Sequence, residues 1–119
     1  MRYDDILGIL QSEKDYAKEH YIPIIRPESA KILYDIVYKY QPSTILEIGT
    51  AIGFSGSIML STSDSVTLDT VELKEELYAK AQEVFAKTNL THRVSQYLGD
   101  AKCVIESLLD SCKTYDMIF

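Results

Sequence analysis

Apolar residues recur along this chain at two spacings, which predict alternating helices and strands. The three-to-four-residue spacing of a buried helix face begins at Tyr3 and returns several times. It predicts helices over residues 3–19, 27–40, 54–60 and 74–89, and a further helix after Asp100. Short apolar runs between them predict strands over residues 45–48, 66–72, 94–98 and 115–119.

Three of these segments carry expectations about burial. In helix 27–40 we expect a buried apolar stripe made of Ile32, Leu33, Ile36, Val37 and Tyr40. In strand 66–72, a buried centre suits Asp69 poorly, so we place Asp69 near the start of the strand. Residues 20–27 form an apolar run with two prolines, which predicts a loop that covers either the core or a ligand.

The order of the elements predicts an α/β fold with a Rossmann-like sheet. Each connection between strands is long enough for a right-handed crossover, so the strands should be parallel, with helices on both faces. The expected strand order is 3-2-1-4, truncated after the fourth strand. At 119 residues the chain holds at most one domain. We divide it into residues 1–43, which are N-terminal helices and a loop, and residues 44–119, which are the first half of the sheet domain.

Composition and charge exclude few classes of protein. The chain is 46% apolar and 25% charged, which suits a globular domain with a core. The net charge of -6, with twelve Lys and Arg scattered along the sequence, weighs slightly against a nucleic-acid-binding face. No apolar run approaches the roughly 20 residues of a membrane span, and the acidic start does not resemble a secretory signal. We therefore expect a cytoplasmic protein with no membrane partner.

The two cysteines suggest no metal chemistry. Cys103 and Cys112 have no CxxC spacing and no histidine at ligand spacing. This favours two reduced helix thiols over a metal site or a disulfide.

The stretch from Thr44 to Gly56 joins a buried strand to a glycine-spaced turn. Gly49 and Gly53 allow a sharp turn and a close approach to a ligand, and helix 54–60 then directs its free amides to the same place. Glu47 is costly to bury unless it is hydrogen-bonded. The stretch therefore predicts a polar ligand or a backbone partner at the turn.

Two further acids follow strands. Glu72 lies 23 residues after Gly49, close to the roughly 20 that separate a glycine turn from a ribose-binding acid. Capping of the helix that begins near Lys74 explains Glu72 equally well, and for Asp100 taken alone capping is the better explanation. All these acids lie at the carboxyl ends of parallel strands, which meet at one crevice where the strand order reverses. This convergence favours a ligand site.

The residues of the turn indicate which class of ligand it can hold. Ala51 replaces the second glycine of the dinucleotide-binding fingerprint, and no Lys followed by Ser or Thr comes after Gly53 as in a P-loop. The turn therefore suits neither a pyrophosphate nor a triphosphate ligand. A nucleoside with ribose hydroxyls and an amino-acid tail fits better, which indicates S-adenosylmethionine (SAM).

Four stretches of the chain resemble a known family. They are residues 45–55, 70–72, 99–101 and 115–119. Together they are similar to class I SAM-dependent O-methyltransferases of the catechol and caffeoyl-CoA type, over residues 20–119. Residues 16–24 further resemble a segment of bacterial tRNA 5-hydroxyuridine methyltransferases.

The resemblance implies a role for each residue of the predicted site. Glu47 and Gly49 would lie beside the methionine part of SAM, whose carboxylate Ser55 would bind. Glu72 would accept the ribose hydroxyls, and Asp100, with the amide that follows it, would hold the adenine edge. The implied cofactor-binding set is Glu47, Gly49, Thr50, Gly53, Phe54, Ser55, Glu72, Gly99, Asp100 and Ala101, with Pro23 and Ile24 in a loop that covers the methyl-donor side.

The resemblance also implies that the chemistry lies outside this chain. Family members continue after such a fourth strand with Ile-Asp, whose carboxylate binds a magnesium ion that favours the ionised acceptor. We therefore expect the catalytic residues beyond Phe119, no metal ligand in this chain, and a fragment that binds SAM weakly and does not catalyse. The parent protein would methylate a hydroxyl on tRNA or on a small catechol-like molecule.

Two further expectations concern partners. A fourth strand without a neighbour leaves unpaired amides, so residues 115–119 predict self-association into a homo-oligomer. The alternative function is a regulatory domain that binds a nucleotide or SAM without chemistry.

Overall fold

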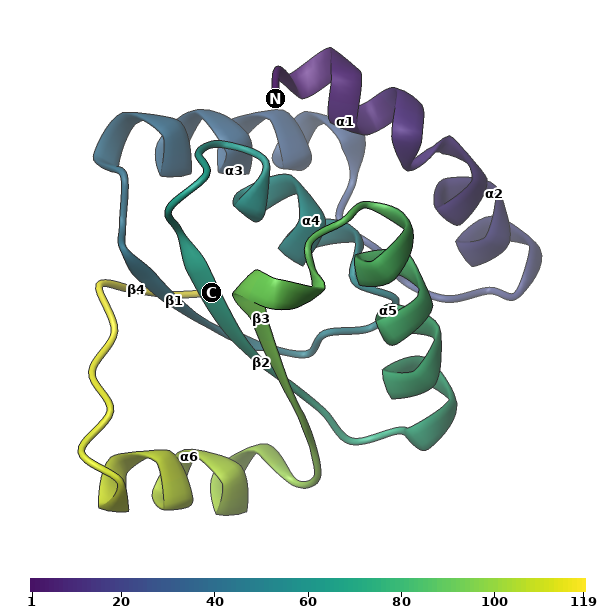
Figure 1. Cartoon of the computed structure of the whole chain (residues 1–119). Coiled ribbons are helices and arrows are strands. Elements are labelled where there is room, and N and C mark those ends of the chain that lie inside the picture. Colours follow the sequence, from purple (N-terminus) through teal and green to yellow (C-terminus); the bar gives the residue numbers. More distant parts are fainter.

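The computed structural model describes all 119 residues and contains one parallel sheet (Figure 1). Its strands are β1 (Thr44–Ile48), β2 (Thr67–Glu72), β3 (Val94–Leu98) and β4 (Met117–Ile118). They lie in the order β3-β2-β1-β4, and each neighbouring pair is parallel. The α/β fold and the predicted strand order are confirmed. One side of β4 pairs with β1, and no strand pairs with its other side.

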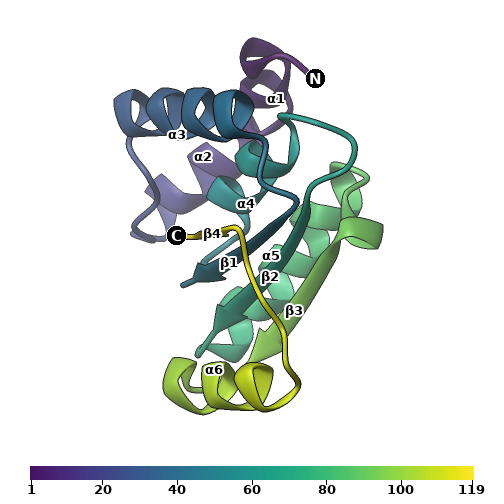
Figure 2. The same ribbon diagram turned by 90° about the vertical axis from the view of Figure 1, so that its left-hand side faces the viewer.

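Helices cover both faces of the sheet unequally (Figure 2). One face carries α3 (Pro27–Tyr40), α4 (Phe54–Leu60) and α5 (Glu75–Lys87), and α6 (Ala101–Asp110) lies alone on the other. The N-terminal helices α1 (Tyr3–Ile9) and α2 (Gln11–Glu19) pack outside the first layer, and a 3-10 turn, η1 (Thr91–Arg93), leads into β3. None of these helices has the length and apolar character that crossing a bilayer requires.

Alternation along the strands divides the core between the two faces. Ile45 and Leu68 join the larger cluster around Phe85, on the face of α4 and α5. Leu46 and Val71 point the other way and pack with the side chains of α6. Because both faces of β1 and β2 are covered, even their polar residues Glu47, Asp69, Thr70 and Glu72 are buried.

The predicted single helix over residues 3–19 is wrong, because the chain bends at Leu10. Leu10 has near-zero ψ, its amide donates to the carbonyl of Ile6, and its own carbonyl accepts from the amide of Lys14. Ile6, Leu10 and Ala17 are all buried in the same cluster. The bend allows both short helices to keep an apolar side against α3 and α4, which one straight helix would not do.

The predicted buried stripe of α3 is only partly correct. Leu33 and Val37 are buried, but the exposed fractions of Ile32, Ile36 and Tyr40 are 59%, 43% and 71%. Ile36 and Tyr40 border an open cavity of about 380 Å³ beside Met117 of β4. They face past the last strand of the sheet, where the chain supplies nothing to cover them.

Asp69 is buried in the middle of β2, and the predicted place near the start of the strand is wrong. It pairs in register with Leu46 and Ser95, and only 8% of it is exposed. Two donors from the connection before β4 stabilise it: Lys113 Nζ at 3.0 Å and Tyr115 Oη at 2.7 Å from Oδ2. Asp69 thereby ties this connection to the sheet.

Candidate functional site

The turn between β1 and α4 depends on two glycines. Gly49 has φ +93° with open space where a Cβ would lie, so backbone conformation, not crowding, favours glycine there. Gly53 has φ +83°, and a Cβ on it would lie 3.2 Å from Phe85 Cζ, so both effects select glycine. The amides of Gly49 and Thr50 donate to the carbonyl of Val71 and fix the turn to the end of β2.

Glu47 lies beneath this turn in a network of hydroxyl groups. It is 1% exposed, and strand register places it beside Thr70, whose Oγ1 donates to Oε1 at 2.7 Å. Ser55 Oγ donates to Oε2 at 2.5 Å from the first turn of α4. Thr50 Oγ1 lies 2.6 Å from Thr70 Oγ1 and donates to it, because the Thr70 proton is already engaged by Glu47.

The network offers Glu47 no cation. Burial raises the pKa of Glu47 to about 7, even though the hydrogen bonds from Ser55 and Thr70 lower it, and the nearby charge of Glu72 raises it further. The sequence predicts a polar ligand or a backbone partner for Glu47, and its partners within the chain are instead two neutral side-chain hydroxyls. One of them, Ser55, also lines the cavity above the turn.

Glu72 links the glycine turn to the start of α5. Its Oε1 accepts from the amide of Ala51 at 2.8 Å and its Oε2 from the amide of Lys74 at 3.0 Å. The amide of Lys74 lies just before α5, and no side chain caps the first turn of this helix, so the predicted capping by Glu72 is wrong. A carboxylate has about four lone-pair positions, so two amide bonds leave acceptor capacity for a ligand.

Asp100 caps α6, as its sequence position alone suggested. Its Oδ1 accepts from the amides of Lys102 at 3.0 Å and Cys103 at 3.4 Å. Gly99 and Asp100 border a separate hollow of about 280 Å³ beside α6. The chain therefore places the predicted adenine-side residues apart from the cavity at the glycine turn, and Ala101 begins α6 next to them.

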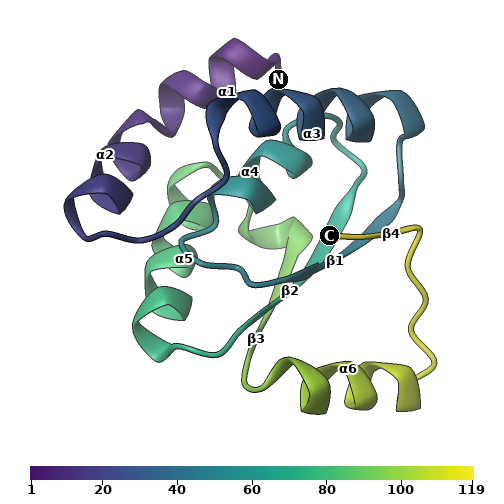
Figure 3. The same cartoon turned by 180° about the vertical axis from the view of Figure 1, so that it is seen from behind.

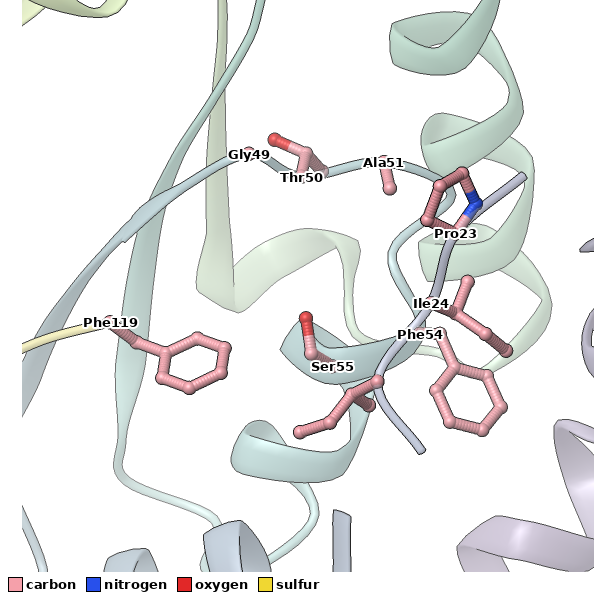
Figure 4. A pocket seen from close by; sticks show the side chains of 9 residues that line it. Pro23, Ile24, Gly49, Thr50, Ala51, Phe54, Ser55 and Phe119 are labelled. Carbon is pink, nitrogen blue, oxygen red and sulfur yellow. The ribbon is translucent and has the colours of Figure 1, made fainter. Parts of the chain in front are cut away.

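The cavity at the glycine turn has a volume of about 350 Å³ (Figure 4). Residues 23–25, between α2 and α3, run past α4 and form one wall (Figure 3). Six predicted site residues line it, namely Pro23, Ile24, Gly49, Thr50, Phe54 and Ser55. Glu47 and Gly53 are buried and do not line it, and Glu72 contacts its rim through the amide of Ala51.

Three lining residues are absent from the predicted set: Ile25, Ala51 and Phe119. Phe119 pairs with β1 through Leu46 and Ile48, which brings its ring to the same end of the sheet. The carboxyl end of the fourth strand meets the same crevice as the first, and this signal could have identified Phe119. Ala51, at φ +50°, holds the left-handed turn position that a glycine usually takes.

Comparison with family models identifies the relatives of this chain. The model described as O-methyltransferase matches residues 8–119. The chain belongs to the O-methyltransferase family. The match includes the glycine turn and every predicted site residue.

Solved structures of O-methyltransferases share the fold. One, from Staphylococcus aureus, is provisionally named a caffeoyl-CoA O-methyltransferase. It is 27% identical to this chain with a TM-score of 0.82, and the alignment covers 98% of this chain and 58% of the Staphylococcus aureus chain. TomG from Streptomyces achromogenes, in complex with SAM, is 23% identical with a TM-score of 0.80, covering 100% and 53%. The Bacillus cereus O-methyltransferase, in complex with SAH, is 23% identical with a TM-score of 0.80, covering 100% and 54%. The chain spans about half the length of these O-methyltransferases.

Metal ligands do not gather in this chain. No group of three His, Cys, Asp or Glu side chains is placed to hold an ion. Asp100 is engaged by the start of α6, and Asp116 accepts from the amide of Ser43 at 2.8 Å. The residues present therefore do not fit a magnesium ion.

Proposed function

We propose that this chain is the SAM-binding half of an O-methyltransferase. The cavity at the glycine turn carries this proposal, because it joins the family's turn to a wall formed by residues 23–25. The O-methyltransferase structures that hold SAM and SAH align over the whole of this chain, which supports the same ligand here.

Each part of the site has a proposed task in holding SAM, which supplies a methyl group on a positively charged sulfur. Because Ser55 donates its proton to Glu47, its oxygen can accept from the ammonium group of SAM and cannot donate to the carboxylate, which corrects the role implied by the resemblance. Glu72 accepts ribose hydroxyls with its remaining lone pairs. Asp100, with the backbone of Ala101, borders the adenine. Pro23 and Ile24 exclude water from the methyl-donor side.

The acceptor side of the reaction belongs to the rest of the parent protein. We infer a hydroxyl acceptor, with 5-hydroxyuridine of tRNA as the first candidate and a small catechol-like molecule as the second. The groups that ionise it, including any magnesium ion and its ligands, are expected beyond Phe119. The chain alone should therefore bind SAM without transferring its methyl group, in the cytoplasm.

Self-association remains part of the proposal. The outer side of β4 carries unpaired backbone groups, and the exposed fractions of Ile118 and Phe119 are 67% and 45%. An open, apolar strand edge is a template for pairing with another chain. We expect a homo-oligomer formed through this edge when nothing else covers it.

A ligand panel tests the proposed function. Thermal unfolding with SAM, SAH, NAD and ATP should show stabilisation by the first two, of about 2.7 kcal/mol at a hundred times the dissociation constant. Stronger stabilisation by NAD or ATP would assign the chain to a different nucleotide-binding function. Methyl transfer by the purified chain with magnesium would contradict the division of labour proposed here.

A further inference from the structure

A second cavity lies on the other side of residues 23–25, the segment that forms one wall of the cavity at the glycine turn, which we call the SAM cavity. The volume of the second cavity is about 530 Å³, and it opens between α2 and the residues that lead into α3. Its floor is apolar, with Ala17, Ile22, Ile24 and Ile25. We call it the basic cavity, because its rim carries Lys14, Lys18 and Arg26.

The three cations of the basic cavity have no acidic partners. The ion pairs of this chain link Arg2, Lys31, Lys87 and Lys113 to acids elsewhere, and none uses a cation of this rim. The only acid at the cavity is Asp15, which accepts from Gln11 Nε2 at 3.1 Å. A chain with a net charge of -6 thus concentrates free positive charge at one hollow.

These cations do not simply form the solvated side of one helix. Lys14 and Lys18 lie one turn apart on α2, but Arg26 comes from the segment that precedes α3. The fold brings two separate stretches of sequence together around the hollow. A concave site with several converging cations concentrates anions more strongly than the same charges spread over a convex surface.

The basic cavity and the SAM cavity share a wall. Ile24 and Ile25 line both, so a molecule that crosses this short apolar segment reaches from one to the other. An acceptor anchored by an anionic group in the basic cavity could therefore extend its hydroxyl toward the methyl donor. Binding energy from such a remote group helps to orient the reacting atoms.

The aromatic side chains at the end of α2 lie outside the lining of the basic cavity. The rings of Tyr16 and His20 stack with centroids 4.0 Å apart, and Lys80 Nζ lies 4.2 Å from the centroid of Tyr16. Tyr21, which follows α2, is 93% exposed. None of these rings lines the basic cavity, and the ring of Tyr16 is already covered by His20 and Lys80, so the cavity's own ligands are its cations.

We propose that the basic cavity binds a phosphate group of the acceptor substrate, with Lys14, Lys18 and Arg26 as its ligands. This inference rests on the proposed function, because it gives the methyl acceptor a phosphate-bearing class. A planar guanidinium and two mobile ammonium groups match the charge and geometry of a phosphate. The phosphate belongs either to a nucleic-acid backbone or to a small nucleotide-linked acceptor.

The test is a titration of the intact 119-residue chain, followed by backbone amide NMR. Adenosine 3′,5′-bisphosphate and a short single-stranded RNA are the two probes, and SAH is titrated in parallel. We expect both probes to shift amides around residues 14, 18 and 22–26. The double variant Lys14→Gln/Lys18→Gln should weaken their binding about tenfold, and Arg26→Gln should weaken it several-fold.

A matched variant separates a site from general charge. Lys39→Gln/Lys102→Gln removes the same charge from exposed lysines elsewhere and should leave probe binding unchanged. Tighter binding of RNA than of the bisphosphate would identify a nucleic-acid acceptor, and the reverse order a small acceptor. Absent shifts, or equal losses in both double variants, would overturn the basic cavity while SAH binding still upheld the proposed function. If SAH does not bind to the unmodified chain, the proposed function itself is contradicted.

Discussion

Glu47 and Asp69 are buried acids on adjacent strands, and their surroundings differ in kind. Asp69 faces α6 and receives an ammonium from Lys113 and a phenol from Tyr115. Glu47 faces α4 and receives only neutral hydroxyls from Ser55 and Thr70. Asp69 is compensated within the chain and ties two segments together. Glu47 lacks a cation beside the cavity proposed to hold a positively charged sulfur, so the uncompensated acid marks the functional side.

The pH dependence of stability should separate the two acids most strongly. The pKa of Glu47 is raised by burial from 4.5 to about 7, so the folded chain holds a proton that the unfolded chain releases. This contribution is fully present below pH 4.5 and is lost as the pH rises through 7, by roughly 3 kcal/mol. Urea unfolding at pH 5 and pH 8 measures it.

The matched variant for this prediction is Glu47→Gln, which keeps the shape and removes the titration. The unmodified chain should gain stability relative to Glu47→Gln as the pH falls from 8 to 5, because only Glu47 takes up a proton. Parallel pH profiles for the two proteins would show that Glu47 does not titrate between pH 5 and pH 8.

Removing the cation from Asp69 should have the next largest effect. Lys113→Met leaves a buried carboxylate with Tyr115 as its only donor. Because the Lys113 side chain is 43% exposed, we expect a loss of about 2 kcal/mol rather than the larger cost of a fully buried pair. Adding Asp69→Asn should recover most of it in urea unfolding. An additive double variant would mean that the ion pair contributes nothing.

Sequence patterns predicted the elements well where the signal is local. Residues 54–60 and 94–98 match α4 and β3, because periodicity and turn residues are read within one segment. The predictions of burial were wrong where residues distant in the sequence decide the burial. Asp69 depends on Lys113, 44 positions away, and Ile36 is exposed at an open cavity beside Met117 of β4.

The candidate site was predictable to the same extent. Gly49 and Ser55 follow from a motif in one stretch, and the structure brings them to one cavity with Pro23. The basic cavity could not be read from the sequence in this way, because it requires the fold to join α2 to the segment before α3. Scattered cations such as Lys18 and Arg26 become a cluster only after folding.

Glu72 should contribute the third effect, on cofactor affinity. Glu72→Ala removes the acceptor proposed for the ribose hydroxyls, and hydrogen bonds to a charged group are worth roughly 1.5 to 3 kcal/mol. We expect SAH to bind about tenfold or more weakly in calorimetry. Glu72→Gln keeps one carbonyl acceptor and should lose less, and Glu75→Ala removes an exposed acid at the start of α5 and should lose nothing. Unchanged affinity in Glu72→Ala would remove Glu72 from the site.

The smallest effect should come from Thr70→Val, which removes the link between Thr50 and Glu47 at nearly constant volume. Both neighbours lose a hydrogen-bond partner in a fully buried position, so we expect a loss of about 1 kcal/mol in urea unfolding. Thr67→Val, on the exposed first residue of the same strand, is the control and should change stability less. Because valine cannot donate, Glu47 should also become harder to ionise, which makes the cost larger at pH 8 than at pH 5. An equal cost at both pH values would mean that Thr70 stabilises the turn by packing alone, without regard to the charge of Glu47.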